Sequence, residues 1–405
     1  MDPQPSTAEP GEAPQSGSVG VPPGPRPPLV IVGASCRAAA ASASAAGWAV
    51  HAADLFDDLD LSRAAVATQR ADPYPQGLVS AVATFPSAPF CYTGAMENHL
   101  PIIDAIATAR PLAGNDSATV RLVRDPAALA ALARHAGLRS PDTHTTPHGL
   151  PTDGSFLRKP VASAGGRGII AWTPSATHSR EPCIWQRLTP GEPLSAVFAL
   201  SAGSCAVLGV ARQRVGAAAC RAPAFAFCGA TLLPPASVPA TVHSQFADLA
   251  AALADHAGLR GIVGIDAILE PDGRLTVLEV NPRPTASAEL VERSTGTSIM
   301  AAHLAAFGHP SPRPSHAGSP GVWSKAILFA ARATHVTDHL LDRLAEHAAP
   351  WTTADGPPAL ADIPRPGQVL RAGAPVLTVF ARGDTDAESA AVLDDRIATL
   401  IAITG

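Results

Sequence analysis

The chain has 405 residues, of which 46% are hydrophobic and 16% charged, and its formal net charge is −5. This length predicts two or three domains, and the apolar content is sufficient for real cores. A slightly acidic chain with scattered basic residues excludes nucleic acid as an expected partner, and the lack of an apolar run of about 18 residues excludes an expected membrane span.

The first 28 residues are rich in Pro, Gly, Ser and Glu and lack the basic and apolar regions of a signal peptide. We predict a disordered tail over residues 1–28. The cysteines form no C-x-x-C pair and have no histidine at zinc spacing, which indicates free thiols in a reducing compartment. A cytoplasmic protein is therefore expected. The six cysteines are Cys36, Cys91, Cys183, Cys205, Cys220 and Cys228.

Residues 29–115 are predicted to form an N-terminal α/β domain. The apolar run LVIVG ends at Gly33, an Ala-rich helical stretch runs to Gly47, and a second strand ends at Asp54. This βαβ opening favours a parallel sheet of the Rossmann-like kind.

The turn from Gly33 to Arg37 lacks G-x-G-x-x-G, so a dinucleotide-binding dehydrogenase is not expected. Free N–H groups at the helix start can hold a carboxylate or phosphate, with Ser35 and Arg37 assisting. The equal alternative is that this turn only connects the strand to the helix and binds no anion. Further on, Glu97 and His99 stand where they would read a substrate amine. A helix N-terminus with a favourable early acid explains them as well.

A helix is predicted from Asp125, its N-cap, to Gly137, which lies just past its end. Pro126 suits the first position of that helix. From Ser155 onward, short strands alternate with glycine turns, which predicts an antiparallel region.

Lys159 ends one of these strands, and a loop of small residues follows it. Its glycines (Gly165, Gly166 and Gly168) allow the backbone to approach phosphates, and the lysine ammonium supplies a compact positive charge. The segment is not a P-loop, because G-x-x-x-x-G-K-[ST] is missing. A glycine-rich hairpin turn is the alternative. Residues 184–195 then end a strand and enter a tight turn. Such a turn can present backbone groups to the edge of a purine and a carboxylate to ribose hydroxyls.

Two further predicted strands, GIVGIDAILE and RLTVLEVNPR, are joined by a Pro-Asp-Gly turn. Side chains alternate along a strand, so Glu279 and Asn281 share a face, and Asp266 on the partner strand projects toward it. Two carboxylates and an amide are hard oxygen donors that hold Mg²⁺ together with nucleotide phosphates, and Arg283 follows closely. A solvated polar edge of the hairpin is the alternative.

The lysine with its glycine loop, the turn at Gly191 and the E-x-N-P-R hairpin occur in this order and resemble the ATP-grasp superfamily. Members of that superfamily clamp a nucleotide between two α+β subdomains. The resemblance covers about residues 29–310 and implies a mixed α/β and α+β fold. The domains it implies are a Rossmann-like parallel-sheet domain at 29–115, an ATP-grasp clamp at 116–310, and a C-terminal α/β segment with a small β unit at 311–405.

The resemblance also implies residue roles. Lys159 would contact the ATP phosphates, and Arg283 would contact the transferring phosphoryl group or the acyl phosphate. Arg124, slightly preferred over Arg121, would supply a basic residue at the start of the clamp. Ser163, Gly165, Gly166 and Gly168 would form the closing flap. Gln186 and Leu188 would border the adenine, and Glu192 would bind the ribose. Asp266, Glu279 and Asn281 would bind one or two Mg²⁺ (or Mn²⁺) ions.

Two positions depart from the superfamily pattern. Gln186 stands where members usually place a glutamate for adenine recognition. Pro193 stands where the ribose-binding glutamate is normal, and Glu192 is the available substitute. A shift of one residue along a strand reverses the face that a side chain occupies, which puts ribose recognition in doubt.

The activity implied is ATP-dependent ligation of a small-molecule carboxylate to an amine through an acyl phosphate, with release of ADP and phosphate. Arg212, Arg214 and Arg221 would hold a second carboxylate. A catalytically silent ATP-binding sensor or scaffold is the alternative, although the retained Lys159 and metal ligands argue against it. Biotin-dependent carboxylation, suggested by the C-terminal strand pattern, lacks a Met-Lys-Met site. The expected partners are the two substrates, without nucleic acid or membrane, and a homodimer is allowed.

Overall fold

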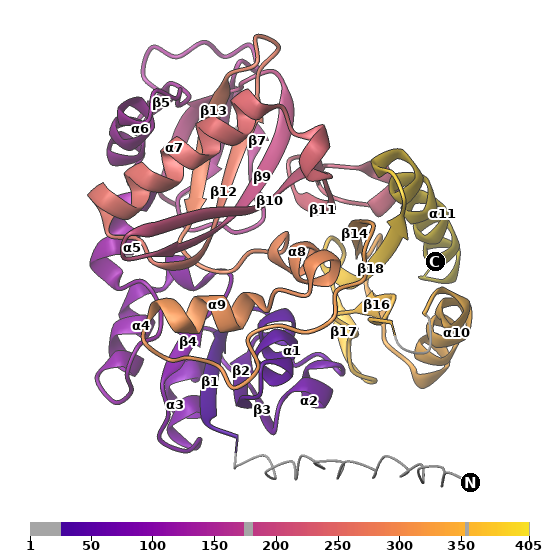
Figure 1. The fold of residues 1–405 in the computed structure, drawn as a ribbon. Helices are drawn as coiled ribbons and strands as arrows, with labels where there is room; N and C mark the ends of the chain where they lie inside the picture. The colour runs from indigo at the N-terminus through magenta and orange to yellow at the C-terminus, as the bar shows by residue number, and fades with distance from the viewer. Residues whose placement is uncertain (1–25, 174–180, 353–355, 405) are drawn as a thin grey trace, which may run out of the picture.

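The computed structural model describes residues 26–173, 181–352 and 356–404. Nearly all of the tail predicted over residues 1–28 lies outside the described residues. Figure 1 shows the N-terminal sheet below a larger sheet, with helices α8 (Ala288–Thr295) and α9 (Ile299–Ala306) between the two. Among the described residues, no helix combines the length and apolar character needed to cross a membrane.

The N-terminal domain contains a four-stranded sheet in the order β3-β2-β1-β4, with parallel pairing throughout. Residues Leu29 to Val32 of the first strand are 0% exposed. They are apolar without alternation because helices pack on both faces of a parallel sheet. The elements are β1 (Pro28–Gly33), α1 (Arg37–Ala45), β2 (Ala49–Asp54), α2 (Leu61–Ala64), β3 (Ala67–Arg70), α3 (Gly77–Ala83), β4 (Phe90–Tyr92), η1 (Met96–Asn98) and α4 (Leu100–Ala107).

Two helices and a small antiparallel sheet follow. Asp125 caps the second helix through its side chain, which accepts a hydrogen bond from Ala128 N at 2.8 Å, and Pro126 occupies the first turn as predicted. The small sheet has the order β5-β8-β6-β7. These elements are α5 (Ser117–Arg124), α6 (Pro126–His135), β5 (Thr143–His144), β6 (Phe156–Pro160), β7 (Ile170–Ala171) and β8 (Cys183–Arg187).

The large sheet has eight strands in the order β13-β12-β9-β10-β11-β14-β18-β16, and neighbouring strands are antiparallel. Three of these strands come from beyond residue 310, so this sheet crosses the predicted domain boundary. The strands are β9 (Glu192–Ser201), β10 (Ser204–Val215), β11 (Phe227–Leu232), β12 (Gly261–Leu269), β13 (Leu275–Asn281), β14 (Val322–Phe329), β16 (Leu360–Ala361) and β18 (Pro375–Gly383).

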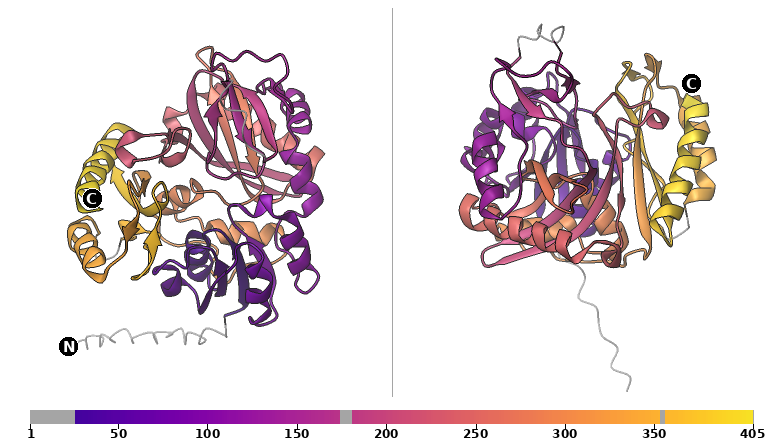
Figure 2. Two further views of the ribbon diagram at one scale, coloured as in Figure 1. Left: turned by 180° about the vertical axis from the view of Figure 1, so that it is seen from behind. Right: turned by 90° about the horizontal axis from the view of Figure 1, so that it is seen from above.

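Helices α7 (Ala240–Ala257) and α11 (Asp386–Thr404) cover the large sheet. Figure 2 shows the C-terminal helix α11 along the strands at one side of the molecule, where it packs on β14 and β18. Helix α7 packs on β9 and β10. The other elements are η3 (Ala218–Cys220), η4 (Pro235–Ser237), β15 (Thr334–His335), α10 (Asp338–Ala348), η5 (Ala349–Trp351) and β17 (Val369–Leu370).

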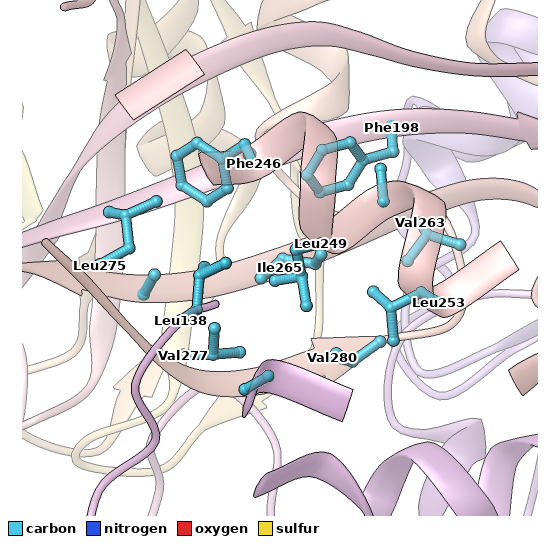
Figure 3. Packing of buried hydrophobic residues seen from close by; sticks show 14 of the residues in the cluster. Leu138, Phe198, Phe246, Leu249, Leu253, Val263, Ile265, Leu275, Val277 and Val280 are labelled. Carbon is cyan, nitrogen blue, oxygen red and sulfur yellow. The ribbon is translucent and has the colours of Figure 1, made fainter. Parts of the chain in front are cut away.

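The core beneath α7 fixes the strands that carry the acidic hairpin. Phe246 of α7 is fully buried against Phe198 of β9, with ring centroids 6.1 Å apart. Val263, Ile265 and neighbouring apolar side chains of β12 and β13 complete this cluster (Figure 3). Burying one such large side chain contributes roughly 1.5–3 kcal/mol. The predicted mixture of a parallel N-terminal sheet and an antiparallel clamp is confirmed.

Candidate functional site

The acidic hairpin forms as the sequence predicts. Strands β12 and β13 pair in antiparallel register, with Asp266 directly opposite Glu279. Gly273 adopts φ +81° in the connecting turn, a conformation that suits glycine. Asn281 Nδ2 donates a hydrogen bond to Asp266 Oδ2 at 3.1 Å. The side chains of Asp266, Glu279 and Asn281 therefore converge, and we call them the oxygen triad.

The oxygen triad fits a magnesium ion by its chemistry. It offers two carboxylates and an amide oxygen, all hard donors, and Gln213 Nε2 supports Asp266 Oδ1 at 2.7 Å. No cluster of three or more His, Cys, Asp or Glu side chains suited to a metal occurs in the described ranges. A magnesium ion would therefore depend on nucleotide phosphates for its remaining ligands, as such sites usually do.

We expect magnesium-dependent ATP binding to weaken as the pH falls below about 6. Burial, and then the charge of Glu279, raise the pKa of Asp266 to about 6. A carboxylate must be ionised to bind metal, so protons compete with the ion below that pKa. Calorimetric titrations of ATP with magnesium, at pH values below and above this pKa, check the effect. An affinity that does not change across this range would contradict it.

The raised pKa of Asp266 also predicts how the free energy of unfolding of the metal-free protein changes with pH. The folded pKa of Asp266 lies above the ordinary carboxyl value, so the folded state binds the extra proton between about pH 4 and about pH 6. The contribution of Asp266 to the free energy of unfolding therefore falls as the pH rises through this range.

Lys159 lies on β6 beside β8, and its ammonium donates to Gln186 Oε1 at 2.9 Å. Gln186 Nε2 in turn donates to Thr143 Oγ1 at 3.3 Å. Burial lowers the pKa of Lys159, because it removes water from the ammonium. An anionic ligand would offset this loss of hydration, so the half-buried lysine is suited to contact phosphate.

The glycine loop after Lys159 docks against the start of β11 and the residues just before it. Phe227 N donates to Gly165 O at 3.0 Å, and a Cβ on Gly166 would lie 2.0 Å from Phe225 O. Ser163 Oγ donates to Arg167 O at 2.6 Å within the loop. These contacts place the loop as a flap over the cavity that it lines.

We expect Gly166→Ala to raise the ATP KM at least about tenfold, which corresponds to ~1.4 kcal/mol. Gly166 has φ +77°, and the added Cβ would collide with the Phe225 carbonyl. Gly165→Ala is the matched comparison, because Gly165 has φ +61° but its Cβ would meet nothing within 4 Å. Steady-state kinetics on both variants separate the collision from backbone strain. Equal effects would contradict docking of the flap.

Two adjoining cavities, of about 640 and 380 Å³, share Lys159, Gly165, Gly166, Gln186 and Glu279 in their walls. The smaller cavity also includes the rest of the oxygen triad, Arg283 and Leu188, and the larger includes Ser163 and Arg124. Arg124 Nη1 donates to Glu279 Oε1 at 2.6 Å, whereas Arg121 pairs with Asp104 at 4.0 Å and is exposed. The contact with Glu279 supports the preference for Arg124.

Glu192 and Gly168 line neither cavity. Pro193 and Ser195 of β9 face the smaller cavity, so Glu192, one residue earlier, points away. Its carboxylate pairs instead with Arg212. This placement argues against the expected ribose role of Glu192, and the reason is the one-residue shift noted in the sequence.

The anion site expected at Ser35 and Arg37 is corrected by the structure. Asp54 Oδ2 accepts a hydrogen bond from Cys36 N at 2.9 Å, so a carboxylate of the chain already occupies the turn. Arg37 is buried and donates to Asp362 Oδ1 at 2.9 Å and to Glu289. Its guanidinium therefore joins the N-terminal domain to later segments.

The arginines expected to hold a second substrate carboxylate also have other partners. All three contact the C-terminal helix α11, which no sequence pattern near them indicates. Arg212 Nη1 lies 3.1 Å from Asp386 Oδ2, Arg214 Nη2 lies 2.7 Å from Asp394 Oδ1, and Arg221 Nη2 donates to Ile401 O at 3.3 Å.

Glu97 is not free to read a substrate amine, because both of its oxygens accept hydrogen bonds from Arg283. His99 packs edge-on against Tyr74, with ring centroids 5.7 Å apart. No sequence pattern indicates this Glu97 contact, nor the contacts of Gln213 and Asn98. Gln213 lies on β10, two strands from β12, so no local spacing could connect it with Asp266.

Residues 127–287 match the family model of the ATP-grasp domain. A comparison with curated proteins found no match. Among solved structures, an N5-carboxyaminoimidazole ribonucleotide synthetase in its ADP complex is 15% identical, with a TM-score of 0.66 over 93% of this chain and 97% of that chain.

Two further solved structures are similar. The carboxyaminoimidazole ribonucleotide synthase from Aspergillus clavatus, complexed with ATP, is 13% identical, with a TM-score of 0.65 over 94% of this chain and 98% of that one. A biotin carboxylase domain of a Hydrogenobacter thermophilus 2-oxoglutarate carboxylase, with MgADP, ADP and bicarbonate, is 12% identical, with a TM-score of 0.65 over 92% and 89%. At these identities the likeness shows the ATP-grasp fold.

Proposed function

We propose that this chain, which carries an ATP-grasp domain and the ATP-grasp fold, is an ATP-dependent carboxylate–amine ligase. It would convert a small-molecule carboxylate into an acyl phosphate and pass the acyl group to an amine, releasing ADP and phosphate. The observation that carries this proposal is the convergence of Lys159, the flap, the oxygen triad and Arg283 around one cavity. Such an arrangement can bind a nucleotide and place a cation beside its terminal phosphate.

Each group has a role that follows from its chemistry. Lys159 binds the β- and γ-phosphates by its ammonium charge, and the oxygen triad would hold magnesium, which neutralises phosphate charge when bound. Arg283 contacts the transferring phosphoryl group and then the acyl phosphate. Catalysis of phosphoryl transfer rests mainly on such positioning and electrostatic stabilisation.

The second step needs protection from water. A carboxylate oxygen bonds to the γ-phosphorus as the bond from phosphorus to the ADP oxygen breaks. The amine then attacks the acyl carbon, the bond to phosphate breaks, and the amine loses a proton. The flap, which contains Gly165 and Gly166, would exclude water from the acyl phosphate until the amine has attacked.

The competing function is a silent ATP-binding sensor or scaffold. A sensor needs phosphate and purine contacts, but it has no use for an arginine, 12% exposed, that is held by an ion pair in the wall of the cavity. Arg283 lines the cavity and is held from the N-terminal domain by Glu97, which favours the ligase.

A screen of carboxylates against amines, read as ADP released from Mg-ATP, tests the proposal. Bicarbonate belongs among the carboxylates, because one similar structure contains it. We expect at least one pair to raise ADP release above the rate with Mg-ATP alone. A protein that binds Mg-ATP tightly but responds to no carboxylate would favour the sensor.

A further inference from the structure

One turn of the N-terminal domain, residues 93–98, reaches the wall of the clamp cavity. We call it the β4–α4 turn. Ala95 within it has φ +71°, a left-handed conformation that is strained for a residue other than glycine. Such strain persists only where surrounding contacts hold the backbone. Two side chains further along the turn, Glu97 and Asn98, make such contacts.

Glu97 accepts hydrogen bonds from Arg283 through both carboxylate oxygens. Arg283 Nε donates to Oε2 at 2.9 Å, and Nη2 donates to Oε1 at 2.6 Å. The Glu97 side chain is 1% exposed. A two-point contact fixes the plane of the guanidinium as well as its position. Burial alone would raise the pKa of Glu97, but the charge of Arg283 outweighs it and lowers that pKa, so the carboxylate is ionised.

The other donors of Arg283 are nearly all used. Nη2 also donates to Asn281 Oδ1 at 3.1 Å, and Nη1 donates to Pro284 O at 3.2 Å. A guanidinium has five N–H groups, so within the described part of the chain one N–H of Nη1 remains for a ligand. A Cβ on Gly94 would lie 3.6 Å from Arg283 Cζ, so the turn itself also borders the guanidinium.

Asn98 makes the second connection. Its Oδ1 accepts from Arg124 Nη2 at 3.0 Å, and its Nδ2 donates to the flap carbonyl of Ser163 at 3.0 Å. Arg124 also contacts Glu279 of the oxygen triad. One amide therefore joins the flap, an arginine and a triad carboxylate to the N-terminal domain.

We propose that Glu97 and Asn98 are positioning residues for phosphoryl transfer. Glu97 orients Arg283 so that its remaining N–H faces the transferring group, and Asn98 holds the flap and Arg124 in the closed arrangement. The inference rests on the proposed function, and it adds that the N-terminal domain completes the site rather than only neighbouring it.

Glu97→Gln tests the first connection. The amide keeps the shape but offers Arg283 one accepting oxygen instead of two, so we expect kcat for ADP release from Mg-ATP to fall about 10- to 100-fold. The ATP KM should change less than about threefold, because both Glu97 oxygens accept hydrogen bonds from Arg283. Glu97→Asp, which keeps the charge, should recover part of the lost kcat. Glu346→Gln on exposed helix α10 is the matched control.

A double-mutant cycle separates positioning from general damage. If Glu97 acts through Arg283, Glu97→Gln should cause no further loss in an Arg283→Met protein. Independent losses that multiply would overturn the role of Glu97. A melting temperature measured for each variant identifies any that lowers kcat by unfolding, and Glu97→Asp then provides the comparison.

Asn98→Ala tests the second connection through the flap. Arg167 is exposed in the flap, so trypsin cleavage after it reports flap opening. Mg-ATP should protect the wild-type protein several-fold, and we expect Asn98→Ala to lose most of this protection, whereas Gln76→Ala on the same domain keeps it. Equal protection in Asn98→Ala would overturn the inference while leaving ATP binding intact. A wild-type protein that neither binds nor cleaves Mg-ATP would instead refute the proposed function and this inference with it.

Discussion

Lys159→Met is expected to lower kcat/KM for ATP about 10²- to 10³-fold, the loss typical when one preorganised charge is removed from a reacting group. Within residues 26–173, 181–352 and 356–404, the half-buried ammonium donates a hydrogen bond to the neutral Gln186, so its charge is available to phosphate. Methionine fills a similar volume without a charge. Steady-state ADP release and calorimetric ATP binding measure the two parts of this loss.

The fold should survive this substitution. Removing a buried charge favours stability, while Gln186 Oε1 loses its donor at a cost of roughly 1–3 kcal/mol. Arg158→Met is the matched control, because Arg158 precedes Lys159 on β6 and lies outside the two cavity walls. An Arg158→Met protein as impaired as Lys159→Met would contradict the phosphate role.

Glu279→Gln is expected to weaken magnesium-dependent ATP binding at least about 10²-fold, since even residues that only support metal ligands typically cost 10- to 100-fold when mutated. Glu279 lies opposite Asp266, and the neutral amide removes one of the two charges that attract the ion. The variant should bind ATP with little dependence on magnesium. Titration of ATP at increasing magnesium concentrations checks this.

Two comparisons sharpen the Glu279 experiment. Glu270→Gln changes the same residue type at the other end of the same hairpin, where Glu270 pairs with Arg139, and it should keep the magnesium dependence. Loss of the Glu279 charge should also lower the pKa of Asp266, because Glu279 contributes to raising it. An unaltered magnesium dependence in Glu279→Gln would place the metal elsewhere.

The acidic hairpin could be predicted because all its information is local. A turn with Asp-Gly sets the register, and the two-residue period of a strand then places Glu279 and Asn281 on one face. The structure contains this arrangement with Asp266 opposite Glu279. The Asp125 cap and the glycine loop after Lys159 are local signals of the same kind.

The long-range contacts could not be predicted from spacing. Glu97 and Arg283 are separated by 186 positions, and Arg37 and Asp362 by 325. Each of these side chains carries a charge that suits a substrate equally well, so the sequence could not tell a ligand contact from an internal ion pair. The C-terminal strands likewise join the large sheet through pairings that no local pattern records.

The central claim is that the site forms an acyl phosphate. The most direct measurement uses the most active carboxylate from the screen with ¹⁸O in both carboxylate oxygens, and mass spectrometry of the phosphate released in the presence of the amine. Attack on the γ-phosphorus followed by aminolysis predicts phosphate that carries one ¹⁸O, and an amide that keeps the other. Unlabelled phosphate, or label found in AMP instead, would contradict the account.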